Sequence, residues 1–217
     1  MKSKILIAGV GGLGSAAAIY LTAAGVGKLR IVDDGKVELS NLNRQILYST
    51  SDLGKPKALT ASKKLLELNP GIEVEPVQER ITESNIHELL DGVDLVVDGQ
   101  DNFKTRFIIN QACIEESKPF IHGAVYAAEG RLMTIIPHRG PCLRCLIPHE
   151  PKELDVVPVL GPLPGLIGVL EGLEAIKLLT GFGKPARGKL LVVDGETLSF
   201  YSIDIKRDPK CPVCGRK

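Results

Sequence analysis

The chain has 217 residues and a formal net charge of +1, with acidic and basic residues mixed along its length. Hydrophobic residues make up 44% and charged residues 24%, which excludes a disordered chain and indicates a packed globular protein. Because the charge is almost balanced, electrostatics gives no reason to expect nucleic acid or an anionic membrane as the main partner.

The length suits one α/β domain with a substantial core and is too short for two. The apolar run before Gly9 is shorter than a signal peptide requires, and no window approaches the ~20 apolar residues of a membrane span. We therefore expect a single cytoplasmic domain over residues 1–217.

The N-terminal half alternates strand and helix patterns. Residues 4–8 are apolar and stop at glycines, and the alanine-rich stretch 13–24 favours a helix that Gly25 ends. Later patterns predict strands at 29–32, 72–77 and 94–98 and helices at 57–68, near 85–90 and at 102–117. Helices between successive strands predict a Rossmann-like, doubly wound, mostly parallel sheet.

The C-terminal part has a different pattern, because strands at 120–125, 131–136, 189–193 and 198–205 are joined more directly and favour antiparallel pairing. The Pro-rich stretch 147–164 predicts a mobile crossover loop, and a helix follows at 166–180 with Gly181 as its stop. We expect a nucleotide-binding part at 1–137, with the crossover loop, cysteine knuckles and last strands at 138–217.

Four glycines follow the first strand and open the first helix: Gly9, Gly11, Gly12 and Gly14. Such a turn lets backbone amides approach a phosphate group. Asp33 follows roughly 20 residues later, the offset at which a carboxylate binds a ribose. Dehydrogenases use the same turn for NAD, so these residues predict an adenosine nucleotide without separating ATP from NAD. Asp34 is interpreted as a solvated or turn-capping carboxylate.

Positively charged side chains distinguish an ATP site from an NAD site. A triphosphate that releases pyrophosphate requires fixed positive charge. Arg44 and Lys57 supply it in the segments 40–45 and 54–57, and Asn41 and Gln45 lie in the first of these. Taken singly, each is typical of a surface or turn residue, and Lys55 is interpreted as a surface charge.

Asp101 follows the strand that ends at Asp98, which puts it at the same sheet edge as the glycine turn. Mg²⁺ bound to phosphates needs only one or two protein carboxylates, so Asp101 is a candidate ligand. It could also cap the helix that follows, a role compatible with the first.

Four of the five cysteines form the pairs Cys142/Cys145 and Cys211/Cys214, each in a Cys-x-x-Cys knuckle with nearby Pro or Gly. This spacing predicts one four-sulfur structural zinc site. A redox pair is the competing interpretation, but no thioredoxin-like context surrounds either pair. Cys113 is expected to be a small buried hydrophobe.

The motifs at 9–14, 40–45 and 54–57, Asp101-Asn102 with Arg106, and the paired knuckles closely resemble the ThiF/MoeB/HesA family, relatives of ubiquitin-activating enzymes. The resemblance covers nearly the whole chain. It implies a homodimeric adenylyltransferase that uses ATP to adenylate the C-terminal glycine of a ubiquitin-like sulfur carrier. The carrier would be ThiS-like or MoaD-like with a Gly-Gly end, the product pyrophosphate, and the pathway thiamine or molybdopterin synthesis.

The resemblance also implies roles for individual residues. Arg44, Lys57 and Asp101 would act in catalysis, the first two on the triphosphate and the third on Mg²⁺. The other cofactor-binding residues would be Gly9, Gly11, Gly12, Gly14, Asp33, Asn41, Gln45 and Asn102. A peptide carboxylate is already ionised at neutral pH, so we expect no general base.

Two departures from the family pattern affect the expected mechanism. Family members usually carry about 25 further residues at the N-terminus, with an arginine that reaches ATP across the dimer. This chain starts just ahead of its first strand, so we expect a less complete triphosphate clamp or a cation from elsewhere. Leu154 stands where the family often has a cysteine, which predicts no covalent cysteine intermediate there.

Three rival functions are compatible with parts of the sequence. The glycine turn and Asp33 favour an NAD-dependent oxidoreductase, which leaves Arg44, Lys57 and the cysteines unexplained. The two departures favour a non-catalytic carrier-binding module. Relatives on the same scaffold dehydrate a modified tRNA base, but the near-neutral charge favours a protein substrate. We expect the carrier tail to pass beneath the loop 147–164, and a sulfur donor to consume the acyl-adenylate.

Overall fold

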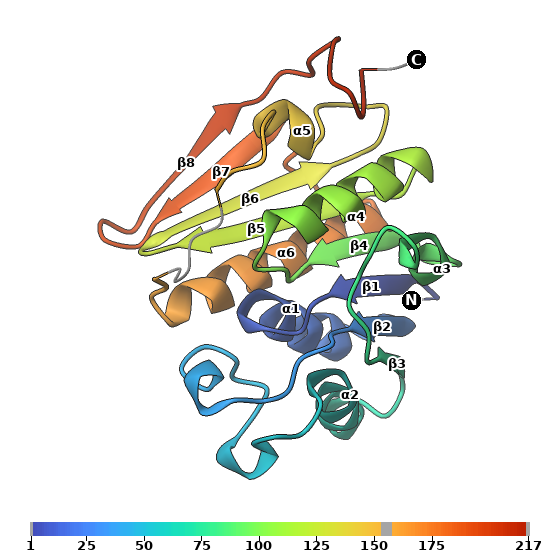
Figure 1. The fold of residues 1–217 in the computed structure, drawn as a ribbon, viewed down its shortest axis with the longest axis vertical. Helices are drawn as coiled ribbons and strands as arrows, with labels where there is room; N and C mark the ends of the chain where they lie inside the picture. The colour runs from blue at the N-terminus through green and yellow to red at the C-terminus, as the bar shows by residue number, and fades with distance from the viewer. Residues whose placement is uncertain (1, 153–157, 216–217) are drawn as a thin grey trace.

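The computed structural model describes residues 2–152 and 158–215, and its strands form one eight-stranded mixed sheet (Figure 1). The strand order is β3-β2-β1-β4-β5-β6-β7-β8. The strands are β1 (Lys4–Ala8), β2 (Lys28–Val32), β3 (Glu73–Val77), β4 (Leu95–Asp98), β5 (Phe120–Tyr126), β6 (Glu129–Ile135), β7 (Lys189–Asp194) and β8 (Ser199–Asp204).

Helices cover both faces of the sheet. They are α1 (Gly12–Ala23), α2 (Lys57–Leu68), α3 (Ile86–Leu90), α4 (Phe103–Glu115), α5 (Leu143–Leu146) and α6 (Pro162–Thr180), with short 3₁₀ turns η1 (Leu39–Asn41) and η2 (Thr50–Asp52). Alternate residues of β1 point to opposite cores: Ile5 and Ile7 pack with α1, α2 and α6, whereas Leu6 and Ala8 pack with α3 and α4. This two-sided burial is typical of a parallel sheet.

The predicted division of the sheet is confirmed. Strands β3, β2, β1, β4 and β5 pair in parallel, and β6, β7 and β8 continue the sheet in antiparallel pairs. Because β1, β2 and β4 are parallel, each connection between them crosses back to the edge of the sheet where the strands start. Their carboxyl ends therefore lie at one common edge. The glycine turn, Asp33 and Asp101 follow those three ends.

Helix α6 begins earlier than predicted. The Pro-rich stretch was expected to continue to residue 164, but the helix starts at Pro162, because proline is favoured in the first turn of a helix, where its missing N–H costs nothing. Its predicted stop is confirmed, since Gly181 adopts the left-handed conformation with φ 71°. The short helix α5 was not predicted.

The end of the crossover stretch is pinned to the sheet. The amide of Ala127 donates to the carbonyl of Pro158 at 2.7 Å, and the amide of Leu160 donates to the carbonyl of Ala127 at 3.0 Å. Leu154 lies outside the described residues. None of the helices in the described part of the chain has the length and apolar composition that a membrane crossing requires.

Candidate functional site

The glycine turn is built by close contact between backbones. A Cβ atom on Gly14 would lie 1.9 Å from the carbonyl oxygen of Gly9, so helix α1 starts directly against the end of β1. Gly9 has φ +90°, which favours glycine at this position. No side chain of the described residues caps α1 at Gly11. The first-turn amides of α1 are therefore suited to bind an anion.

Asp33 is tied to this turn by both carboxylate oxygens. Oδ2 accepts a hydrogen bond from the amide of Val10 at 2.9 Å, and Oδ1 accepts one from the amide of Gly35 at 2.8 Å. Each oxygen keeps a second lone pair for a ligand hydroxyl. The carboxylate thus lies beside the glycine turn, as the ribose assignment requires.

Lys57 approaches the same place from the start of α2. A Cβ atom built on Gly35 would lie 3.0 Å from Oδ1 of Asp33 and 3.5 Å from Nζ of Lys57. The structure therefore brings the ammonium group and the carboxylate together around Gly35, at the sheet edge where the glycine turn lies.

Arg44 and Gln45 pack against the turn from the other side. Built Cβ atoms on Gly12 and Gly11 would lie 3.5 Å from Cγ of Arg44 and 3.5 Å from Nε2 of Gln45. Gln45 is 4% exposed, and its Oε1 has no hydrogen-bond partner among the described residues. This buried acceptor is the kind of group that a bound ligand or a water molecule satisfies.

The Arg44 guanidinium binds its own loop. Its Nη1 donates to the carbonyl of Ser40 at 3.1 Å and to Oδ1 of Asn43 at 2.9 Å. Asn41 stabilises the same loop. Its Oδ1 accepts a hydrogen bond from the amide of Glu38 at 3.2 Å, and its backbone carbonyl accepts from the amides of Arg44 and Gln45. Asn41 therefore shapes the turn that presents the other two.

The Asp101 turn abuts the glycine turn. A Cβ atom on Gly99 would lie 2.0 Å from the carbonyl oxygen of Gly9. Asp101 itself is exposed and receives one hydrogen bond, from Nδ2 of Asn102 at 3.4 Å. The alternative capping role of Asp101 is wrong, because Oδ1 of Asn102 accepts from the amide of Thr105 at 2.9 Å and caps α4. Among the described residues only Asn102 bonds to the Asp101 carboxylate, which keeps further lone pairs for a ligand.

A buried polar network beneath this turn was missed by the sequence analysis. Asp98 accepts from the amide of Gln100 at 3.0 Å and from Nδ1 of His122 at 2.7 Å. Nε of Arg106 lies 3.1 Å from the same carboxylate, and its Nη2 donates to the carbonyls of Gln100 at 2.5 Å and Gly123 at 3.1 Å. Arg106 therefore fixes the turn that carries Asp101.

Burial and neighbouring charges shift the pKa values of two side chains in this network. Burial lowers the pKa of His122, although its hydrogen bond to Asp98 acts in the opposite direction. A neutral imidazole that donates through Nδ1 fits this environment. Burial, followed by the charge of Asp98, raises the pKa of Glu171 well above its usual range. Arg106 and Asp98 thus lie at ion-pair distance, and burial favours the protonated form of Glu171.

The position of Glu171 on a buried helix face could have been found from the sequence. It lies on α6 one turn after Ile167 and one turn before Ala175, both of which are buried. Helical periodicity therefore places a carboxyl group on the apolar face of the helix. Its carboxyl oxygens are buried and make no hydrogen bond of normal geometry with the described residues.

The two cysteine knuckles come together at the antiparallel end of the sheet. The four sulfur atoms, of Cys142, Cys145, Cys211 and Cys214, all lie within 4.8 Å of one another. Two of the distances are 3.7 Å (Cys142 to Cys211) and 3.3 Å (Cys145 to Cys214). A tetrahedral Zn²⁺ site with bonds of ~2.3 Å has sulfur atoms about 3.8 Å apart, so the cluster fits this metal.

The cluster lies apart from the glycine turn. Cys142, Cys211 and Cys214 belong to the core beneath α4, together with Ile135 and Leu190. Figure 1 shows α5 and the C-terminal segment at the end of the sheet where β7 and β8 lie, away from α1 and α2. This position favours a structural role. The buried Cys113 lies in the same core outside the cluster, as predicted.

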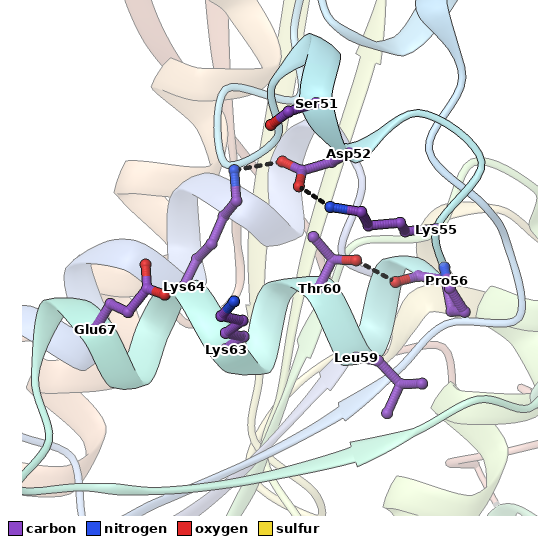
Figure 2. A pocket seen from close by; sticks show the side chains of 9 residues that line it. All are labelled: Ser51, Asp52, Lys55, Pro56, Leu59, Thr60, Lys63, Lys64 and Glu67. Carbon is purple, nitrogen blue, oxygen red and sulfur yellow. Dashed lines mark hydrogen bonds and ion pairs between the residues drawn. The ribbon is translucent and has the colours of Figure 1, made fainter.

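The hollow in Figure 2 lies on the outer side of α2 and contains none of the predicted catalytic residues. Asp52 lies 3.2 Å from Nζ of Lys55 and 2.5 Å from Nζ of Lys64, and these pairs, Lys64 above all, lower its pKa. Lys55 is thus a surface charge. The Asp52–Lys64 pair attaches the loop after Gln45 to α2.

Comparisons with known proteins agree with this geometry. The ThiF family model matches residues 1–213. The SAMP-activating enzyme E1 of Haloferax volcanii is 45% identical, over 99% of this chain and 81% of that protein. The sulfur carrier protein adenylyltransferase of Thermus thermophilus is 44% identical, over 99% and 83%.

Solved structures share the fold. The crystal structure of Escherichia coli MccB with ATP superposes with a TM-score of 0.89 at 23% identity, covering 99% of this chain and 67% of that one. At this identity the likeness concerns the arrangement of the sheet and helices.

Proposed function

This chain belongs to the ThiF family, and from that premise we propose that it adenylates the C-terminal glycine of a ubiquitin-like sulfur carrier with ATP. The observation that carries the proposal is that Arg44 and Asp33 contact one glycine turn while Lys57 lies beside Asp33. Relatives named for the activation of sulfur carriers or SAMP support the class of substrate. Thiamine and molybdopterin synthesis are the pathways we expect to receive the sulfur.

The nucleotide would lie along the edge formed by β1, β2 and β4. The glycine turn offers amides to phosphate, and Asp33 offers carboxylate oxygens to the ribose hydroxyls. The Lys57 ammonium group lies next to Asp33, where it can reach the phosphates. Arg44 would exchange its two contacts within the loop for the triphosphate.

Asp101 would hold the magnesium ion. Its carboxylate is exposed at the same edge and is not used to cap α4, so an oxygen ligand is available to a hard cation. The ion supplies positive charge to the phosphates when it is bound. The chain's own contribution is the position of Asp101, which Arg106 fixes through the carbonyl of Gln100.

The reaction needs no protein base. A terminal carboxyl group has a pKa of about 3.3–3.7 and is ionised at neutral pH. Its oxygen forms a bond to the α-phosphorus of ATP, the bond from that phosphorus to the bridging oxygen breaks, and pyrophosphate leaves with the electron pair. Arg44 and Lys57 stabilise the charge that moves to pyrophosphate. His122, which lies beneath the Asp101 turn, is buried and bound to Asp98, which agrees with a reaction lacking a base.

The end of the crossover stretch supports a path for the carrier tail. A Cβ atom on Gly161 would lie 2.5 Å from the carbonyl oxygen of Asn43, so the end of this stretch lies against the Arg44 loop. A flexible glycine-ended tail would pass beneath this stretch to the α-phosphate. The acyl-adenylate would then wait for a sulfur donor, and we expect the enzyme to act as a homodimer.

Mass spectrometry of the carrier tests the proposal. The purified chain is mixed with ATP, Mg²⁺ and separate ThiS-like and MoaD-like carriers, and we expect one carrier to gain the mass of AMP. The matched control is the same carrier without its last glycine, which should gain none. Carriers that never gain AMP, with tight binding of NAD instead of ATP, would establish the oxidoreductase. ATP binding without AMP transfer to any carrier would favour the non-catalytic module.

A further inference from the structure

Tyr48 is a buried residue outside the motifs that define the nucleotide site. It lies in the loop between η1 and η2 and is 6% exposed. Its Oη is 3.0 Å from the carbonyl oxygen of Val10 in the glycine turn and 3.3 Å from the carbonyl oxygen of Lys57 at the start of α2. The single hydroxyl proton, shared between two carbonyls, therefore links two segments that carry the proposed phosphate-binding groups.

The backbone of Tyr48 reaches the third such segment. Its amide donates to the carbonyl of Gln45 at 3.0 Å, in the turn that also presents Arg44. The peptide group of Val10 is held at both ends, because Asp33 accepts from its amide while Tyr48 donates to its carbonyl. Burial, followed by the charges of Asp33 and Asp52, raises the pKa of Tyr48, so the hydroxyl remains a donor at neutral pH.

We infer that Tyr48 is a positioning residue, whose hydroxyl sets the place of Lys57 relative to the glycine turn and thereby the affinity for a triphosphate. This inference rests on the proposed function, because it assumes that Lys57 binds phosphates of ATP. The bridge has a specific consequence. AMP, which lacks the two outer phosphates, should be nearly indifferent to the loss of the hydroxyl.

Nucleotide binding measured by calorimetry without carrier tests this role. The variant Tyr48→Phe keeps the ring and removes only the hydroxyl, and we expect it to weaken ATP binding about tenfold while AMP binding changes less than twofold. The matched control is Tyr20→Phe on α1, where the ring is 55% exposed. It should leave both affinities unchanged. All measurements are made well below the unfolding temperature of each variant.

Two further variants separate positioning from simple loss of structure. In a Lys57→Ala background, Tyr48→Phe should change ATP affinity less than twofold, because the group that the hydroxyl positions is gone. Replacing Tyr48 with 4-aminophenylalanine, whose N–H groups restore the donor, should return ATP affinity to within about threefold of the original chain.

Equal weakening of ATP and AMP, or a full tenfold loss in the Lys57→Ala background, would overturn the inference while leaving the proposed function intact. ATP binding that weakens as expected, with no AMP transfer to any carrier, would remove the proposed function alone. Failure of the unsubstituted chain to bind ATP would overturn both.

Discussion

Nε of Arg106 lies 3.1 Å from Oδ2 of Asp98, and both side chains are buried directly beneath the turn that carries Asp101. This pair connects the core of the sheet to the candidate metal ligand, because the same guanidinium donates to the carbonyl of Gln100. The core and the site therefore share a residue whose loss should affect both.

Replacing Arg106 by Ala should leave Asp98 as a buried carboxylate with its cation removed. Breaking a buried ion pair in this way costs about 3–5 kcal/mol, so we expect a large decrease in the free energy of unfolding, measured with urea. The control is Arg131→Ala, whose partner Glu129 lies at the surface. It should cost less than about 1 kcal/mol. Similar losses for both variants would contradict the assignment.

Glu171→Gln should stabilise the protein increasingly as the pH rises above the unfolded glutamate pKa of about 4.3. The pKa of Glu171 is raised in the folded state, so its favourable contribution is complete below the unfolded pKa of about 4.3 and is lost as the pH rises toward the folded value. Glutamine does not ionise, so the free energy of unfolding of the variant does not fall with pH for this reason. We expect equal urea stabilities near pH 4 and an advantage for the variant that grows between pH 5 and 8. The neighbouring Asp98, Arg106 and His122 are common to both chains, so a constant difference across this range would contradict the prediction.

Gly14→Ala should prevent the glycine turn from forming, because the new Cβ atom would lie 1.9 Å from the carbonyl oxygen of Gly9. Backbone atoms cannot move aside as a flexible side chain can, and we expect a loss of at least about 2–3 kcal/mol together with loss of ATP binding. Gly165→Ala in α6 is the control, since no described atom outside its own helical turn lies within 4 Å of its Cβ position. Thermal unfolding should show a stability equal to or higher than that of the original chain.

Asp101→Ala should abolish carrier-dependent exchange of pyrophosphate into ATP while leaving the fold intact. The side chain is exposed, so the free energy of unfolding should change by less than about 0.5 kcal/mol. Asn102→Ala should show a different effect, a loss of roughly 1 kcal/mol, because it removes the cap of α4. Undiminished exchange by the Asp101 variant would reject its metal-binding role.

The purified protein should contain one zinc ion per chain, measured by elemental mass spectrometry. Cys211→Ser, or a strong chelator, should remove the metal and lower the unfolding temperature. The free energy of binding a structural zinc ion, several kcal/mol, contributes to the stability of the folded state. Cys113→Ala provides the control, since this cysteine lies outside the cluster. It should keep the zinc, and a metal-free native protein would support the redox interpretation instead.

Much of the architecture could be predicted from local pattern. Strand and helix periodicity located the parallel half, the antiparallel strands and the stop of α6 at Gly181. The assignment of phosphate, ribose and metal roles to single residues remains a prediction, because those roles depend on a bound nucleotide. The helix cap shows the limit of local reasoning, since Asp101 and Asn102 are adjacent and equally suited by residue type.

The glycine turn, the order of strands along the chain and the two cysteine pairs follow from the amino-acid sequence, because each depends on residue type at short spacing. Contacts between side chains far apart in the sequence depend on the folded arrangement of the sheet and helices. Asp98, His122 and Glu171 come from β4, β5 and α6, and Tyr48 reaches both Val10 and Lys57. Such contacts follow from how layers pack, and burial then sets which of these groups carry charge.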